Sequence, residues 1–192
     1  MAENNTNIHL PESIEIKTGN VSIPLYGLIG GIIGIVVTVI MYIGGVNTWF
    51  NVALNFSWTV ALYVIGVVAA LQIKKLNDGH LFFNTALKYI FGTVVIGSLI
   101  VYLSHYILMN HIDPDFAYNV SVKTASLYEE SLRKYGVAES EIEKLTEDMT
   151  KHNGYTWNKV LVGFGMGMIV AFIISAIIAA IIKKNKYKYL GL

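Results

Sequence analysis

The feature that most constrains this chain is a run of 24 residues between Lys88 and Asp113 that contains no Asp, Glu, Lys or Arg. A helix rises about 1.5 Å per residue, so a run of this length can cross the roughly 30 Å of hydrocarbon in a bilayer. The run ends at Asp113-Pro114-Asp115, where a polar segment begins. Asp113 suits the N-cap of a new helix, Pro114 its first position, and Asp115 its first turn. We therefore expect a membrane-spanning helix that ends at this corner and an extramembrane helix that begins there.

Two further uncharged stretches complete the membrane pattern. Residues 18–73 contain no formally charged side chain, and these 56 residues are too many for one span but suit two helices joined by a tight turn. The Gly44–Thr48 segment supplies that turn, and we expect Trp49 and Phe50 beside it at the membrane interface. The last stretch lies between Lys159 and Lys183. The predicted spans are residues 24–43, 51–73, 83–109 and 160–182.

The composition agrees with an integral membrane protein. The chain is 54% hydrophobic and 14% charged, with a mean hydropathy of +0.54, whereas soluble domains carry about 25% charged residues. A net charge of +1 excludes a strongly basic nucleic-acid binder. The absence of cysteine excludes disulfides, thiolate nucleophiles and Cys-ligated metal clusters. We expect membrane lipids as partners, no nucleic acid and no cofactor.

The polar segment between the third and fourth predicted spans has helical periodicity. Its first half ends at Gly136, which suits the position after a helix C-terminus. Its second half places Ile142, Leu145 and Met149 at spacings of three and four residues, with acids elsewhere. The fold class predicted is therefore all-α, a bundle of four transmembrane helices with an extramembrane amphipathic helical hairpin at about residues 113–153. We expect the apolar stripes of this hairpin to pack on each other or on the bilayer surface.

Lysines predict the orientation. They cluster at Lys74 and Lys75 and again from Lys183 onward, and basic residues near span ends favour the cytoplasm. Four spans place both clusters on one side, so we expect both termini in the cytoplasm and the hairpin outside. Residues 1–20 are polar and are expected to form a short tail, disordered or lying on the surface, before a single membrane domain at residues 21–192.

Four glycines crowd the first predicted span. Such small residues let two helix backbones approach closely in lipid. They could form a dimer seam or a sliding contact, or they could pack inside the bundle of one chain. The residues are Gly27, Gly30, Gly31 and Gly34.

Four polar residues within or beside the spans are further candidates. Asn51 and Asn55 share a helix face and could bond a neighbouring helix or line a polar path. Lys88 could be a functional intramembrane cation or could extend its ammonium to the headgroups. His105 could serve as a polar tip at the outer interface, and the histidine spacing supports no metal site.

Several motifs resemble one bacterial family. They are YGLIGGIIGIV at residues 26–36, GHLFFNTALK at 79–88, HIDPDF at 111–116 and LRKYGVAESEIEKL at 132–145. With them the chain resembles the membrane proteins grouped as domain of unknown function 4199, over residues 26–182. The resemblance implies an envelope protein of Gram-negative bacteria in the inner membrane. It implies no catalytic residue, ligand or activity.

No enzyme signature accompanies these features: the chain has no P-loop, HExxH, GxSxG or strand-to-helix GxGxxG motif. The acids near the second half of the hairpin fit a solvated helix face and lack the spacing of an EF-hand. We therefore expect a non-enzymatic envelope scaffold or complex subunit whose hairpin presents an amphipathic, acidic face to a partner protein or to the outer leaflet. The partners expected besides lipid are an envelope protein or further copies of the chain in a homo-oligomer. The alternative is a small oligomeric transporter or channel, with the glycines and Asn55 at a helix interface that lines a path.

Overall fold

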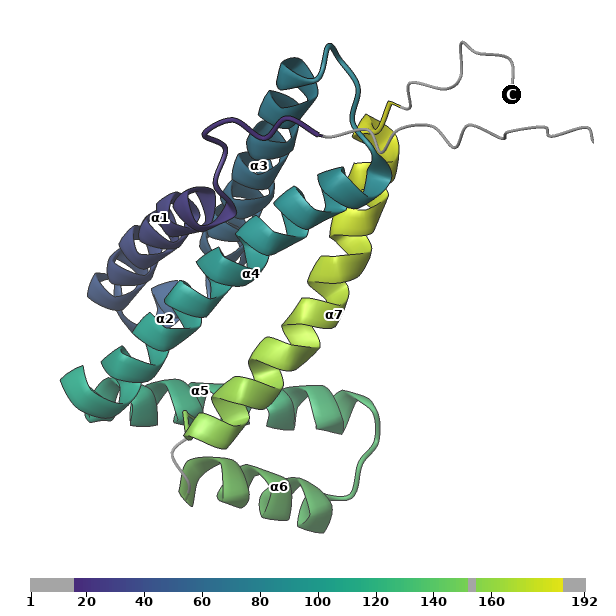
Figure 1. The fold of residues 1–192 in the computed structure, drawn as a ribbon. Helices are drawn as coiled ribbons and strands as arrows, with labels where there is room; N and C mark the ends of the chain where they lie inside the picture. Colours follow the sequence, from purple (N-terminus) through teal and green to yellow (C-terminus); the bar gives the residue numbers. More distant parts are fainter. Residues whose placement is uncertain (1–15, 152–154, 185–192) are drawn as a thin grey trace, which may run out of the picture.

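The computed structural model describes residues 16–151 and 155–184, and these residues are almost entirely helical. Four helices are long and apolar enough to cross a membrane, with α4 and η1 forming one continuous span. A short helix links the first two, and a hairpin of two amphipathic helices precedes the last, which confirms the predicted fold class (Figure 1). The elements are α1 (Ile23–Ile43), α2 (Gly45–Trp49), α3 (Val52–Leu76), α4 (Phe83–Ile107), the π-helical turn η1 (Leu108–Ile112), α5 (Pro114–Lys134), α6 (Glu139–Lys151) and α7 (Trp157–Ile182).

The helix bounds differ from the predicted spans mainly at polar edges. α3 continues beyond residue 73 through Lys74 and Lys75, because cations in the last turn complement the exposed carbonyl groups of a helix C-terminus. α4 does not stop at residue 109 but passes through η1 to Asp113. α6 ends at Lys151, and the predicted end of the hairpin at residue 153 lies outside the described residues, as do residues 1–15 of the predicted tail.

The bundle is organised around α4, which packs against α1, α3 and α7 (Figure 1). α7 lies along α4 and has little contact with α3, so few of its side chains are buried. Aromatic pairs follow the α4–α7 seam, and Phe91 meets Phe172 edge to face at 5.4 Å. The buried residues of α7 are all small: Ala171, Ser175 and Ala179.

One end of the bundle, here called the lysine end, collects both described chain ends. Leu81 and Lys184 exchange two backbone hydrogen bonds of 2.9 and 3.0 Å, and Lys74 Nζ donates to the carbonyl of Ile182 at 2.8 Å. The Asn77 side chain accepts from the Lys17 amide and donates back to the Lys17 carbonyl. The described part of the predicted tail therefore lies on the bundle surface, paired with the α3–α4 connector.

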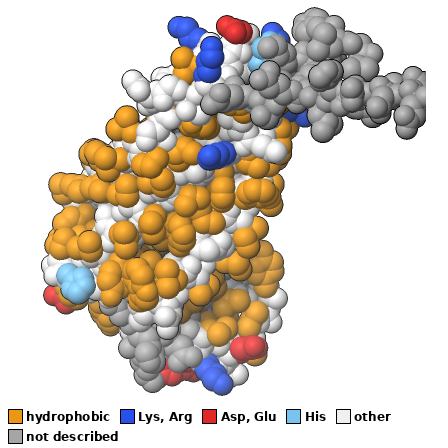
Figure 2. Space-filling model, viewed as in Figure 1, with side chains coloured by type: hydrophobic (Ala, Val, Ile, Leu, Met, Phe, Trp, Pro, Cys, Tyr) orange, Lys and Arg blue, Asp and Glu red, His pale blue; other side chains and the backbone are white. Residues whose placement is uncertain are grey.

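Apolar and charged side chains are separated on the molecular surface in the way that a membrane protein requires. Figure 2 shows a broad band of hydrophobic side chains between two ends where Lys, Arg, Asp and Glu gather. Many large apolar side chains of the four long helices are exposed in that band, including Ile32 and Val36 of α1 and Ile173 of α7. An exposed apolar surface of this extent is compatible with lipid and not with water.

Candidate functional site

The hairpin lies across the end of the bundle opposite the lysine end, here called the hairpin end (Figure 1). α5 runs next to the bundle, and α6 folds back on the far side of α5. The turn between them has Gly136 at φ 74°, and Val137 N–H bonds to the Leu132 carbonyl while Gly136 N–H bonds to the Arg133 carbonyl. This is the Schellman arrangement, which satisfies the last carbonyls of α5 and sends the chain back as α6.

An apolar joint fixes α5 to the bundle. The Phe116 ring meets Tyr42 edge to face at 5.0 Å and Trp49 at 5.5 Å. Met41, Leu108 and Met109 pack in the same buried cluster. The prediction that Trp49 is an interfacial residue was wrong: its side chain is 8% exposed, because α5 and His105 cover it.

Asp113 ties the joint together with both carboxylate oxygens. Its Oδ1 accepts the Phe116 amide at 2.8 Å and so caps α5, which Pro114 opens. Its Oδ2 accepts the hydroxyl of Tyr42, in the last turn of α1, at 2.9 Å. The same side chain therefore starts the hairpin and connects it to the first long helix.

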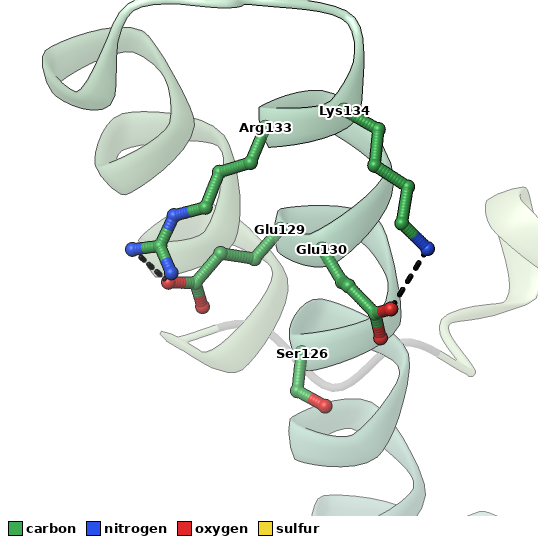
Figure 3. Close-up of a pocket in the computed structure, with 5 residues that line it drawn as sticks. All are labelled: Ser126, Glu129, Glu130, Arg133 and Lys134. Carbon is green, nitrogen blue, oxygen red and sulfur yellow. Dashed lines mark hydrogen bonds and ion pairs between the residues drawn. The ribbon is translucent and has the colours of Figure 1, made fainter.

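Exposed ion pairs lie at the far end of α5, in a shallow depression with Ser126 (Figure 3). Arg133 bonds Glu129 at 2.8 Å within α5 and bonds Glu139 of α6 at 2.9 Å, across the turn. Lys134 bonds Glu130 at 2.8 Å. The hydrogen bond with Glu139 raises the pKa of Arg133, and the hydrogen bond from Lys134 lowers the pKa of Glu130. Exposed pairs of this kind contribute little stability, and of these three the Arg133–Glu139 pair joins the two helices.

The outward side of α6 is acidic. Ile142 is 2% exposed and is buried in the hairpin, whereas Glu139, Glu141, Glu143 and Glu147 are exposed, together with Lys144. This is the arrangement of an amphipathic helix with a solvated acidic face. Within residues 16–151 and 155–184, no group of three or more His, Cys, Asp or Glu side chains could hold a metal ion.

His105 is turned into the bundle and away from the predicted position at the interface. Its Nε2 lies 2.9 Å from Thr38 Oγ1, and its ring lies 5.0 Å from the Trp49 ring. The Thr38 hydroxyl donates its hydrogen to the Gly34 carbonyl at 2.9 Å. The imidazole must therefore donate to Thr38, which makes His105 a link between α1 and α4 beneath the hairpin.

The two asparagines of α3 serve its start. Asn51 is the N-cap and accepts the Leu54 amide at 3.1 Å. The Asn55 amide group donates to the carbonyls of Trp49 and Asn51 at 2.8 and 3.0 Å. Both side chains fix the α2–α3 junction, and the structure does not turn the Asn55 amide toward a path between helices.

The α1 glycines pack within this chain. All four are buried, and an added Cβ would lie 2.6 Å from Ile96 at Gly27 and 2.8 Å from Ile100 at Gly31. Gly30 and Gly34 face Leu62 of α3 and Val101 of α4. In the structure these glycines therefore pack inside the bundle of one chain, which is one of the interpretations that the sequence left open.

Lys88 is exposed near the start of α4, close to the lysine end. Sequence reasoning did not single out Tyr42, Thr38 or Asn77, although each makes a long-range bond that closes the structure. The signal in the sequence is a polar side chain within an apolar run or at its end, and it does not identify the partner.

The most elaborate construction among the described residues is thus the hairpin and its joint. Comparison with curated proteins gave no match, and comparison with solved structures gave none either. The family model described as protein of unknown function (DUF4199) matches residues 25–184. That match includes all four long helices except the first two residues of α1, and the whole hairpin. The chain is therefore a member of the DUF4199 family of membrane proteins.

Proposed function

We propose that this protein is a non-enzymatic component of the bacterial envelope that works by contact through its α5–α6 hairpin. The observation that carries the proposal is the contrast between the two sides of the hairpin. One side is fixed to the bundle by Phe116, Tyr42 and Asp113, and the other side exposes the acids of α6. A rigidly held, solvated helix face is suited to recognition by another surface.

The orientation proposed places the hairpin in the periplasm and both termini in the cytoplasm of the inner membrane. Lys74 and Lys75 lie at the lysine end, together with Lys183 and Lys184. Basic residues beside span ends favour the cytoplasmic side. The hairpin lies at the opposite end of the bundle (Figure 1).

The partner proposed is an envelope protein with a basic surface. Glu143 and Glu147 are exposed one turn apart on α6. The nearby cations Arg133 and Lys134 are engaged by carboxylates of the hairpin, and Lys144 is an exposed cation on α6 itself. The surface offered by α6 is thus acidic on balance, and complementary charge would guide the encounter and select the partner. The transporter hypothesis depended on the glycines and Asn55 at a helix interface. The α1 glycines are buried against α3 and α4, and the Asn55 amide group is used at the α2–α3 junction.

Photo-crosslinking from position 143 in intact cells tests this proposal. We expect a discrete adduct with one envelope protein, lost in Glu147→Lys and retained in the matched variant Glu147→Asp, because residue 147 lies one turn from residue 143 on the same face of α6. Formation of the same adduct in all three chains, or of none in the parent chain, would overturn the proposal. Membrane abundance of each variant, measured by blotting, separates lost contact from lost protein.

A further inference from the structure

The stripe of α5 that covers the bundle continues beyond it. Phe116, Ala117 and Val120 are buried at the hairpin end. At 3.6 residues per turn, Leu127 and Tyr128 follow Val120 and Ala117 on the same side of the helix, about two and three turns further on. Leu127 is 41% exposed, Tyr128 53% and Tyr135, seven residues after Tyr128, 84%. The second half of α5 therefore carries large side chains on the side that its first half buries.

The bundle covers only the first half of α5. The first half packs on α2 and η1, and α6 runs alongside. In Figure 1 the second half extends past the lower end of α7, with α6 on its far side. The apolar stripe on the second half of α5 is thus uncovered on the side that faces the four long helices.

The depth of this stripe relative to a membrane is set by its neighbours. α5 begins at Pro114, immediately after the span Phe83–Ile112 ends. The neighbouring span α7 begins at Trp157, which meets Tyr106 of α4 edge to face at 5.3 Å. Tyr and Trp concentrate at the headgroup level of membranes. The side of α5 that faces the bundle therefore faces the bilayer wherever the bundle does not cover it.

We propose that the second half of α5 rests on the leaflet at the hairpin end, with Leu127, Tyr128 and Tyr135 among the lipid headgroups and upper acyl chains. Amphipathic helices bury an apolar face to this depth when they lie in the plane of a membrane. The occupant is a phospholipid surface, because the spans require a bilayer on that side and a protein would have to displace it. Lys134 and Arg133 are engaged by carboxylates, so zwitterionic lipid suffices. The inference depends on the four spans and not on the protein partner proposed above, so either can fail alone.

The chain has no cysteine, so a single introduced cysteine can carry a nitroxide label without ambiguity. Leu127 and Val122 form a matched pair, since both are apolar, both belong to α5 and each is 41% exposed. They point in directions about 140° apart around the helix. Leu127→Cys, Tyr135→Cys and Val122→Cys are reconstituted singly into phosphatidylcholine nanodiscs that hold one copy, which excludes a second chain as the occupant.

Power-saturation electron paramagnetic resonance then measures the access of each label to oxygen, which concentrates in lipid, and to a water-soluble nickel complex. We expect the labels at 127 and 135 to have lower access to nickel and higher access to oxygen than the label at 122, which remains accessible to nickel. Equal nickel access at 122 and 127 would overturn the proposal. So would protection that appears only when anionic lipid is added, because the contact would then be electrostatic. Position 135 lies at the exposed C-cap of α5, so its label keeps the test valid if the Leu127 variant unfolds.

Discussion

The Tyr42 hydroxyl donates a 2.9 Å hydrogen bond to Asp113 Oδ2, which joins the last turn of α1 to the start of α5. The same carboxylate caps α5 through Oδ1. One side chain therefore contributes both to the attachment of the hairpin to the bundle, beside the apolar joint around Phe116, and to the initiation of α5. A change at Asp113 should affect both, and a change at Tyr42 only one.

Asp113→Ala should loosen the first turn of α5, because replacing an acidic N-cap by alanine costs about 1 kcal/mol. Tyr42→Phe should leave the cap intact and weaken only the attachment to α1. Hydrogen exchange of the amides at residues 116–120, measured in detergent micelles, should rise more in Asp113→Ala than in Tyr42→Phe. Asp115→Ala is the control, since Asp115 lies in the same turn and is exposed. A rise as large in Asp115→Ala would contradict the role given to Asp113.

The four spans could be predicted from sequence because the rule that governs them is local. A charge inside hydrocarbon is costly, so the absence of charge over residues 89–112 or 160–182 is enough to indicate a span. The cap at Asp113 is equally local, since its bond to Phe116 joins residues three apart. These features need no knowledge of which helices become neighbours.

The surroundings of Trp49 and His105 could not be predicted in this way. Whether Trp49 meets lipid or protein depends on where α5 lies after the corner at Asp113, and that is set by contacts such as the one with Phe116, far along the chain. His105 lies near the end of α4, where its side chain could face either lipid or α1. The hydrogen bond with Thr38 holds it against α1. Periodicity gives the sides of a helix but not what covers each side.

The Thr38 contact predicts the tautomer of His105. Thr38 has a single hydroxyl hydrogen, which the Gly34 carbonyl accepts, so the hydrogen between Thr38 and His105 belongs to Nε2. We expect nitrogen-15 NMR of labelled histidine to show the Nε2–H form for this residue. Thr38→Val removes the acceptor and should destabilise the fold by about 1–3 kcal/mol, as expected for a buried donor left unpaired. Thr59→Val is the control, because Thr59 makes a comparable bond to the carbonyl four residues earlier at an exposed position. An Nδ1–H signal would refute the hydrogen-bond assignment.

Close helix packing predicts a sharp contrast between glycines. An added Cβ at Gly66 would lie 3.1 Å from the backbone of Ile90, and one at Gly31 would lie 2.8 Å from Ile100. Gly66→Ala and Gly31→Ala should each destabilise the bundle by about 1–3 kcal/mol, the usual cost of overpacking. Gly163→Ala is the matched control in α7, where a Cβ meets nothing within 4 Å, so helix propensity should leave that variant equal or more stable. Thermal unfolding in detergent gives the order, and a fall in Gly163→Ala as large as in Gly66→Ala would show that packing is not the cause.

Single-cysteine labelling tests the orientation that the lysines predict. Ser126 is exposed on α5, and Asn84 is exposed in the first turn of α4, near the lysine end. Because the parent chain has no cysteine, each variant offers one thiol. In cells whose outer membrane is permeabilised, a membrane-impermeant maleimide should label Ser126→Cys and leave Asn84→Cys unlabelled until the inner membrane is also opened. The cysteine-free parent chain is the negative control. The reverse pattern would place the lysine end outside, against the tendency of basic residues to stay in the cytoplasm, and the acidic face of α6 would then meet cytoplasmic partners.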